Sequence, residues 1–165
     1  MKQLILVRHA KSDWSTPSLG DFDRPLNERG KRDAPMMAQR LLEKKIKIDV
    51  FVSSPAKRAR KTAVVFAKEY KSDKEGIIFI EDLYAAPAEV FSAVIGRLDD
   101  QFDSAAIFSH NPGITDFANS LTNTRIDNIP TCGIFAVKAD IRKWKDFEGA
   151  PKEFWFADYP KAGLD

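Results

Sequence analysis

Two basic residues with different chemistry follow the first apolar run of this chain. Arg8 and His9 come directly after Leu4–Val7, which contains two β-branched residues and predicts a buried strand. Open α/β sheets bind their ligands at the carboxyl ends of strands. An imidazole beside a guanidinium at such a place is suited to a nucleophile that faces an anion, most readily a phosphoryl group. A surface Arg-His pair on a turn is the alternative explanation of these two residues alone.

Two further predicted strands also end in basic residues. Asp49–Val52 leads into a helix start that carries Arg58, and Ala105–Ser109 leads directly into His110. The chain has two histidines, and each follows a predicted strand. Because the carboxyl ends of parallel strands share one edge of the sheet, we expect these side chains to converge. Helix starts at two of the three ends add free backbone N–H groups, which favour a phosphate.

The residue types at these ends suit phosphoryl transfer. Arg8 and Arg58 can each offer a planar pair of N–H groups to phosphoryl oxygens, and His110, if protonated, adds a third cation. One imidazole can attack phosphorus in line to form a phosphohistidine, which water then hydrolyses. Positioning and charge stabilisation do most of this work, so no metal or other cofactor is required. The residues alone leave open whether His9 or His110 attacks.

The elements that must position these residues alternate along the chain. Apolar residues at helical spacing predict a helix from Asn27 or Glu28 to Lys45, with Pro35 in its first turn or bending it. Strands alternating with helices indicate a largely parallel sheet in one α/β domain, residues 1–165. The other predicted helices run from Ser54-Pro55 to Tyr70, from Pro87 to Leu98 and from Asn111-Pro112 to Leu121; the other strands are Ile77–Ile80, Gly133–Val137 and Phe154–Phe156.

Composition excludes several classes of protein. With 44% apolar and 30% charged residues the chain has a globular composition, and its net charge of +2 gives no reason to expect nucleic acid. Cys132 is the one cysteine, so no intrachain disulfide can form, and its apolar surroundings favour a buried side chain. No apolar run approaches the roughly 20 residues that span a membrane, and the first is too short for a signal peptide, so we expect a cytoplasmic protein without membrane contact. Two histidines about 100 residues apart make a poor metal-ligand set.

At the three strand ends the chain resembles the histidine phosphatase (phosphoglycerate-mutase-like) superfamily, and within it the small SixA-type phosphohistidine phosphatases. The resemblance covers roughly the first 120 residues. It implies a three-layer α/β/α sandwich with a mostly parallel sheet, His9 as the nucleophile, and a phosphate pocket completed by Arg8, Arg58 and His110. The matching segments, in the family's order, are Leu6–Ser12, Asp23–Gly30, Ser53–Ala63 and Ser109–Pro112.

Four further residues are candidates for substrate binding. Ser15 lies six positions after His9, where larger members of the superfamily often have an Asn that touches phosphate. Lys11, Ser12 and Arg24 are expected at the mouth of the pocket. A solvated loop explains each of these residues equally well.

One departure from the superfamily bears on the substrate. Mutases and many phosphatases of this superfamily place a Glu or Asp shortly after the third strand as proton donor, and here that position holds Ala85. An alkoxide leaving group needs a positioned acid, whereas a phosphohistidine leaves as imidazole and needs one far less. The absent acid favours a phosphohistidine substrate, although Glu81 or Asp82 could still reach the site.

The expected partner is a phosphorylated protein. The chain has only a short turn between Leu98 and Ala105, where mutases carry segments that cover a small sugar phosphate, and an open pocket suits a phosphohistidine on a protein. A phosphate or sulfate ion should also fit. A small-molecule phosphomonoesterase and a non-catalytic phosphoprotein-binding domain are the alternatives. We expect a monomer or weak dimer, with the aromatic stretch Trp144–Phe156 in the core or an edge strand rather than on a binding surface.

Overall fold

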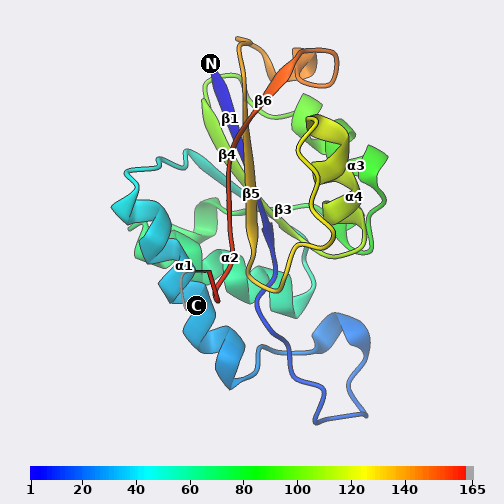
Figure 1. Cartoon of the computed structure of the whole chain (residues 1–165). Helices are drawn as coiled ribbons and strands as arrows, with labels where there is room; N and C mark the ends of the chain where they lie inside the picture. Colours follow the sequence, from blue (N-terminus) through cyan, green and yellow to red (C-terminus); the bar gives the residue numbers. More distant parts are fainter. Residues whose placement is uncertain (163–165) are drawn as a thin grey trace.

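The computed structural model describes residues 1–162, in which strands and helices alternate as the sequence predicts (Figure 1). The side chain of Asn27 caps the first helix by accepting a hydrogen bond from the Gly30 N–H. The strands are β1 (Lys2–Arg8), β2 (Val50–Ser53), β3 (Ile78–Phe79), β4 (Ser104–Ser109), β5 (Ile134–Ala139) and β6 (Lys152–Asp158), and the α-helices are α1 (Glu28–Glu43), α2 (Lys57–Glu69), α3 (Ala88–Gly96) and α4 (Gly113–Leu121). Four short 3₁₀ turns complete the described elements: η1 (Asp21–Asp23), η2 (Lys74–Gly76), η3 (Glu81–Leu83) and η4 (Trp144–Asp146).

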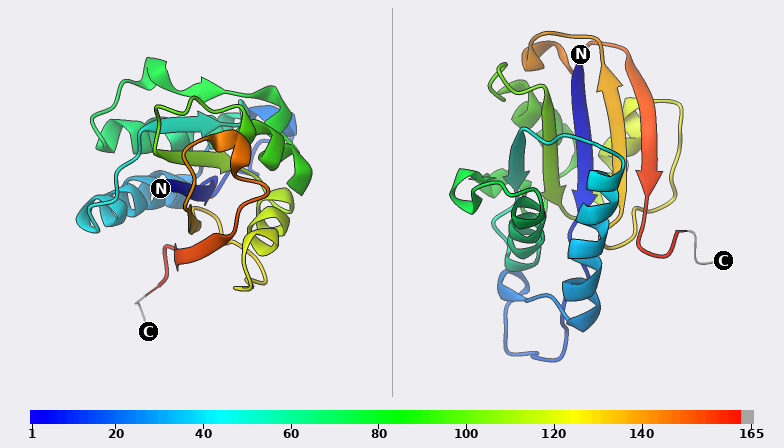
Figure 2. Two further views of the ribbon diagram at one scale, coloured as in Figure 1. Left: turned by 90° about the horizontal axis from the view of Figure 1, so that it is seen from above. Right: turned by 90° about the vertical axis from the view of Figure 1, so that its left-hand side faces the viewer.

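The six strands form one sheet in the order β3-β2-β4-β1-β5-β6. β3, β2, β4 and β1 pair in parallel, whereas β5 and β6 are antiparallel to their neighbours. The right-hand view of Figure 2 shows this arrangement, with β5 running opposite to β1. The sheet is therefore mostly parallel, as expected, and its three longer parallel strands β1, β2 and β4 all end at one edge.

The sheet is covered on both faces, so the fold is a three-layer α/β/α sandwich. Along β1, Leu4 and Leu6 belong to one core with α3 and α4, and Ile5 and Val7 to the other core with α1 and α2. This alternation follows from the pleat, which turns successive side chains to opposite faces. The strand's apolar run is continuous because both faces are buried.

The start of α2 differs from the prediction. The helix begins at Lys57, not at Ser54-Pro55, and no side chain caps it. The Ser54 hydroxyl lies 2.7 Å from the Nε2 atom of His110 and also accepts a hydrogen bond from the Ala56 N–H at 3.2 Å. Ser54 therefore connects the segment before α2 to His110 while it keeps a local contact with the backbone.

Two other elements differ from the prediction in part. Pro35 lies inside α1 beyond its first turn, so the other half of that prediction, a bend at Pro35, stays a prediction. Strand β3 is reduced to Ile78–Phe79, and both of these side chains are exposed because it is an edge strand.

The C-terminal aromatic residues pack as expected. Trp144 and Phe147 are fully buried, and the Trp144 indole donates a hydrogen bond to the carbonyl oxygen of Phe102. Trp155 and Phe156 lie on the edge strand β6 and are each covered by a lysine ammonium group. Within residues 1–162, no helix is both long and apolar enough to cross a membrane.

Candidate active site

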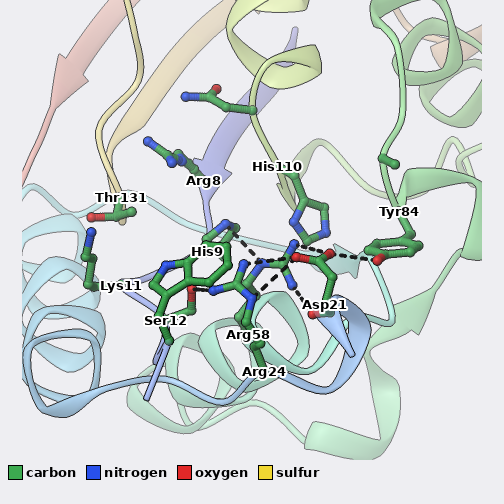
Figure 3. Close-up of a pocket in the computed structure, with 13 residues that line it drawn as sticks. Arg8, His9, Lys11, Ser12, Asp21, Arg24, Arg58, Tyr84, His110 and Thr131 are labelled. Atoms are coloured by element: carbon green, nitrogen blue, oxygen red, sulfur yellow. Dashed lines mark hydrogen bonds and ion pairs between the residues drawn. The ribbon is translucent and has the colours of Figure 1, made fainter. Parts of the chain in front are cut away.

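The carboxyl ends of β1, β2 and β4 meet in register. Arg8 lies opposite Ser109 in the sheet, and the backbone N–H groups of His9 and Ser54 donate to carbonyl oxygens of β4. A pocket of about 350 Å³ opens at this edge. Figure 3 shows the side chains that converge on it. All four residues predicted to carry the chemistry line this pocket: Arg8, His9, Arg58 and His110.

Several close contacts fix the strand end that carries His9. The Ala10 N–H donates to the Thr62 hydroxyl of α2, and the Cys132 N–H donates to the carbonyl oxygens of Arg8 and His9. A Cβ atom at Gly30 would lie 2.2 Å from the Lys11 carbonyl oxygen, so α1 approaches this segment as closely as a glycine allows. The backbone around His9 is therefore held from three directions.

His9 has one ring nitrogen prepared for attack. Its Nδ1 atom lies 2.8 Å from the Ala10 carbonyl oxygen, and since a carbonyl oxygen only accepts, Nδ1 carries the proton. Burial, together with the charges of His110, Arg58 and Arg8, lowers the pKa of His9 from 6.5 to about 3. The ring is therefore neutral near pH 7, and Nε2 is unprotonated. Its lone pair accepts a long hydrogen bond from the Nε–H of Arg58, at 3.4 Å.

Two buried nitrogens in the pocket wall lack a protein partner among residues 1–162. They are Nε of Arg8, whose Nη1 donates to the Ile129 carbonyl oxygen, and Nδ1 of His110, whose Nε2 contacts Ser54. Buried polar atoms normally have partners, so unpaired ones at a pocket indicate a ligand. Burial and the charge of Arg58 lower the pKa of His110 to about 4. A bound phosphoryl dianion would oppose that shift.

Known proteins resemble this chain along most of its length. The model of the histidine phosphatase superfamily (branch 1) matches residues 4–83. The matched segment is just under half of the chain and contains Arg8, His9 and Arg58. The structure of the protein histidine phosphatase SixA complexed with tungstate superposes with a TM-score of 0.83 and 20% identity, covering 99% of both chains, so the two share a fold.

Two sequence relatives extend the comparison. An uncharacterised chloroplastic protein of Arabidopsis thaliana is 29% identical over 153 residues, which is 88% of this chain and 70% of that protein. Phosphoserine phosphatase 1 of Hydrogenobacter thermophilus is 44% identical over 70 residues. That match covers 41% of this chain and 32% of the relative, so the chain aligns with only a third of that protein's length.

Asp21 joins three side chains of the pocket, and it was not among the predicted site residues. Its carboxylate accepts hydrogen bonds from Arg58, Arg24 and the Tyr84 hydroxyl, the last at 2.7 Å. Burial raises the pKa of Asp21, but these three donors outweigh it and hold the pKa well below its usual range. Asp21 is therefore a carboxylate at all ordinary pH values. An Asp three residues before a predicted pocket arginine is the one local sign of its role.

Arg58 is oriented through two of its edges. Its Nη1 and Nη2 atoms donate to the backbone oxygen and the carboxylate of Asp21, at 2.6 and 3.0 Å. The other edge, with Nε, turns toward Nε2 of His9. Asp21 thus fixes the end of the guanidinium, while the Nε–H donates to the His9 nitrogen that would carry a phosphoryl group.

The residues predicted at the pocket mouth divide into two groups. Lys11, Ser12 and Arg24 line the pocket, and Arg24 donates to the Ser12 hydroxyl while its guanidinium stacks 3.5 Å from the centre of the Trp14 ring. Ser15 does not line it: the residue is exposed, and its backbone N–H donates to the Asp13 carboxylate.

The wall after the third strand is formed by Tyr84 and Ala85. Ala85 adopts a left-handed backbone with φ of 55°, which costs a residue with a Cβ atom about 1 kcal/mol. Glu81 and Asp82 are exposed on η3 and do not line the pocket. Among the described residues, Asp21 is the one carboxylate that does, and no cluster of three His, Cys, Asp or Glu side chains is arranged to hold a metal ion.

Proposed function

We propose that this chain, acting as one domain of residues 1–165, hydrolyses phosphohistidine on proteins through a phosphorylated His9. The observation that carries the proposal is the neutral His9 ring, whose Nε2 lone pair faces Arg58 inside a pocket rich in cations. An unprotonated imidazole is a nucleophile, and the surrounding guanidinium groups suit the phosphoryl oxygens. Similarity to the superfamily supports phosphatase activity, and the tungstate in the related SixA structure, a phosphate analogue, supports an oxyanion site.

The first step transfers the phosphoryl group to His9. The Nε2 lone pair forms a bond to phosphorus while the P–N bond of the substrate breaks, and its electron pair stays on the leaving ring nitrogen. A substrate ring protonated on its other nitrogen leaves as neutral imidazole, so no proton moves in this step. His9 keeps its Nδ1 proton on the Ala10 carbonyl oxygen throughout.

The second step hydrolyses the phosphorylated enzyme. A water oxygen bonds to phosphorus as the bond to Nε2 breaks, and the electron pair returns to Nε2. The two water protons remain on the product as dihydrogen phosphate, which exchanges with solvent. The side chains of Arg8, Arg58 and His110, which line the pocket, provide hydrogen bonds for the three peripheral oxygens in both steps. Neither step uses a metal ion.

The lack of a proton donor in the pocket favours a substrate with a P–N bond over one with a P–O bond. The position where other members carry the proton donor holds Ala85, and Glu81 and Asp82 are exposed outside the pocket. The remaining carboxylate, Asp21, stays ionised because three donors hold it, so it has no proton to give. An alkoxide would leave this pocket without help, whereas imidazole needs none.

A protein substrate is supported by the surface around the pocket. Three of the exposed large apolar side chains, Trp14, Leu19 and Phe22, lie on the segment that borders the mouth. A second hollow of about 270 Å³, lined by Trp14 and Leu19 among others, adjoins the first. Exposed apolar groups gathered at one place indicate a protein contact. A cytoplasmic location and a monomeric or weakly dimeric state stay predictions.

A small-molecule phosphomonoesterase is the second candidate function. It is favoured by the match to phosphoserine phosphatase 1, although that match spans a third of the relative. The deciding experiment compares kcat/KM for a histidine-phosphorylated protein, phosphoserine and a sugar phosphate, each with and without EDTA. We expect the phosphohistidine substrate to be preferred at least tenfold, with no effect of the chelator. Equal rates on all three would favour the phosphomonoesterase, and binding without turnover would identify a phosphoprotein-binding domain.

A further inference from the structure

The Tyr84 hydroxyl donates its hydrogen to Asp21, while its oxygen can still accept a hydrogen bond. A carboxylate only accepts, so the 2.7 Å contact between Tyr84 and Asp21 requires the phenol to donate. Within residues 1–162, no protein donor reaches the phenol oxygen in return. Tyr84 therefore offers an acceptor to whatever enters the pocket, and its bond to an ionised carboxylate makes that oxygen a better acceptor.

Tyr84 lies in the wall of the pocket into which the leaving group of a substrate would point. It precedes Ala85, at the wall where other superfamily members carry their proton donor, and it lines the same pocket as His9. Its ring lies edge-on to Phe22 and to His110, with ring centres 5.1 and 5.6 Å apart. Figure 3 shows Tyr84 beside His110. The hydroxyl is also tied through Asp21 to Arg58, which orients the phosphoryl group.

We propose that the Tyr84 oxygen accepts a hydrogen bond from the distal ring N–H of a phosphohistidine substrate, with Asp21 behind it. This inference rests on the proposed function. The distal N–H belongs to the protonated phosphoimidazole, the form that leaves as neutral imidazole. This acceptor favours cleavage because it keeps the substrate ring protonated, and no proton is transferred. The bond from His9 Nε2 to phosphorus forms, the P–N bond breaks with its electron pair on the leaving nitrogen, and the distal hydrogen stays on the imidazole, hydrogen-bonded to the Tyr84 oxygen.

The same pair of side chains explains selectivity against phosphomonoesters. An alkoxide leaving group needs a donor, but the Tyr84 proton is held by Asp21, and the hydrogen bond to Asp21, followed by burial, raises the pKa of Tyr84. The alkoxide of a phosphoserine would therefore face the Tyr84 oxygen, which accepts a hydrogen bond but cannot supply the proton that the alkoxide needs. The other charged or titratable groups facing the pair are Arg24 and Arg58, bonded to Asp21, and His110 against the Tyr84 ring, with Arg8 and Lys11 also lining the pocket.

The test is Tyr84→Phe, which keeps the ring and its two edge contacts. Two probes are compared in the full chain: phosphohistidine as the free amino acid, and p-nitrophenyl phosphate, whose leaving group departs as a stable anion without any N–H. We expect kcat/KM for phosphohistidine to fall about tenfold and that for p-nitrophenyl phosphate to change less than about twofold. The alkaline limb of the kcat profile for phosphohistidine should also move to lower pH by about half a unit, because the bound ring loses the acceptor that keeps it protonated.

Tyr159→Phe is the matched control, since Tyr159 is exposed and lies outside the pocket, and it should leave both substrates unaffected. An equal loss on both probes, or no loss on either, would overturn the role of Tyr84 while the proposed function stood. A wild-type protein that cleaves p-nitrophenyl phosphate but not phosphohistidine would overturn the proposed function, and the inference with it.

Discussion

Nδ1 of His9 lies 2.8 Å from the carbonyl oxygen of Ala10, the next residue in the chain. This single contact determines which ring nitrogen is free, since the proton must stay on Nδ1 to satisfy the carbonyl oxygen. It also distinguishes the two histidines that the residue pattern alone left equivalent: His110 has no such fixed acceptor on Nδ1, and its Nε2 is engaged by Ser54. We therefore propose that His9 is the nucleophile and that His110 binds the phosphoryl group.

Burial of both imidazoles predicts a loss of stability in acid. The pKa of His9 falls to about 3 and that of His110 to about 4, mainly because burial disfavours the imidazolium, while both return to about 6.5 on unfolding. Between pH 6.5 and 4 the unfolded chain binds more protons than the folded chain. The contribution of the two neutral histidines to the free energy of unfolding is therefore fully present above pH 6.5 and decreases as the pH falls. Each histidine contributes up to about 1.4 kcal/mol per pH unit.

Urea denaturation at pH 7, 6 and 5 measures this dependence. The variant His110→Gln removes one of the two groups and should have about half the slope of the wild type over this range. A free energy of unfolding that is constant from pH 7 to 5 in the wild-type protein would show that neither ring is held neutral.

Arg58→Lys tests whether the geometry of the guanidinium matters beyond its charge. Lysine keeps the cation but cannot contact Asp21 with one edge and His9 with the other. We expect kcat/KM to fall roughly 100-fold, the usual cost of removing one transition-state donor. Arg60→Lys is the matched control, because Arg60 lies on the same helix but outside the pocket. Activity of Arg58→Lys within about twofold of wild type would show that simultaneous contact of the guanidinium with Asp21 and His9 is not required.

How far the sequence alone reaches can be judged at individual residues. The strand ends were predictable because each combines a continuous apolar run with a basic residue, and parallel pairing brings such ends together. Asp21 was not predicted, since an Asp in a polar loop has no periodicity and two of its three partners, Arg58 and Tyr84, lie far along the chain. The helix α2 begins at Lys57 rather than at the predicted Ser54-Pro55. Ser15 is excluded from the pocket by a loop geometry that its spacing from His9 does not encode.

Leu19→Ser tests the protein substrate. Leu19 is 41% exposed beside the pocket and does not line it, so the change should leave hydrolysis of free phosphohistidine unaltered. With a histidine-phosphorylated phosphotransfer domain as substrate, we expect KM to rise about threefold to tenfold, as for loss of one apolar interface contact. Ile78→Ser, equally exposed on the distant edge strand, is the control. A Leu19→Ser protein with an unchanged KM for the phosphorylated domain would show that this loop does not contact the substrate protein.

The most direct test of the account is to identify the residue that becomes phosphorylated. The enzyme is mixed with ³²P-labelled phosphohistidine substrate, quenched within milliseconds in alkaline denaturant to preserve the acid-labile P–N bond, and mapped by peptide mass spectrometry. The account predicts label on Nε2 of His9 in the wild type, and neither label nor hydrolysis in His9→Ala. Label on His110, or hydrolysis that persists in His9→Ala, would contradict it.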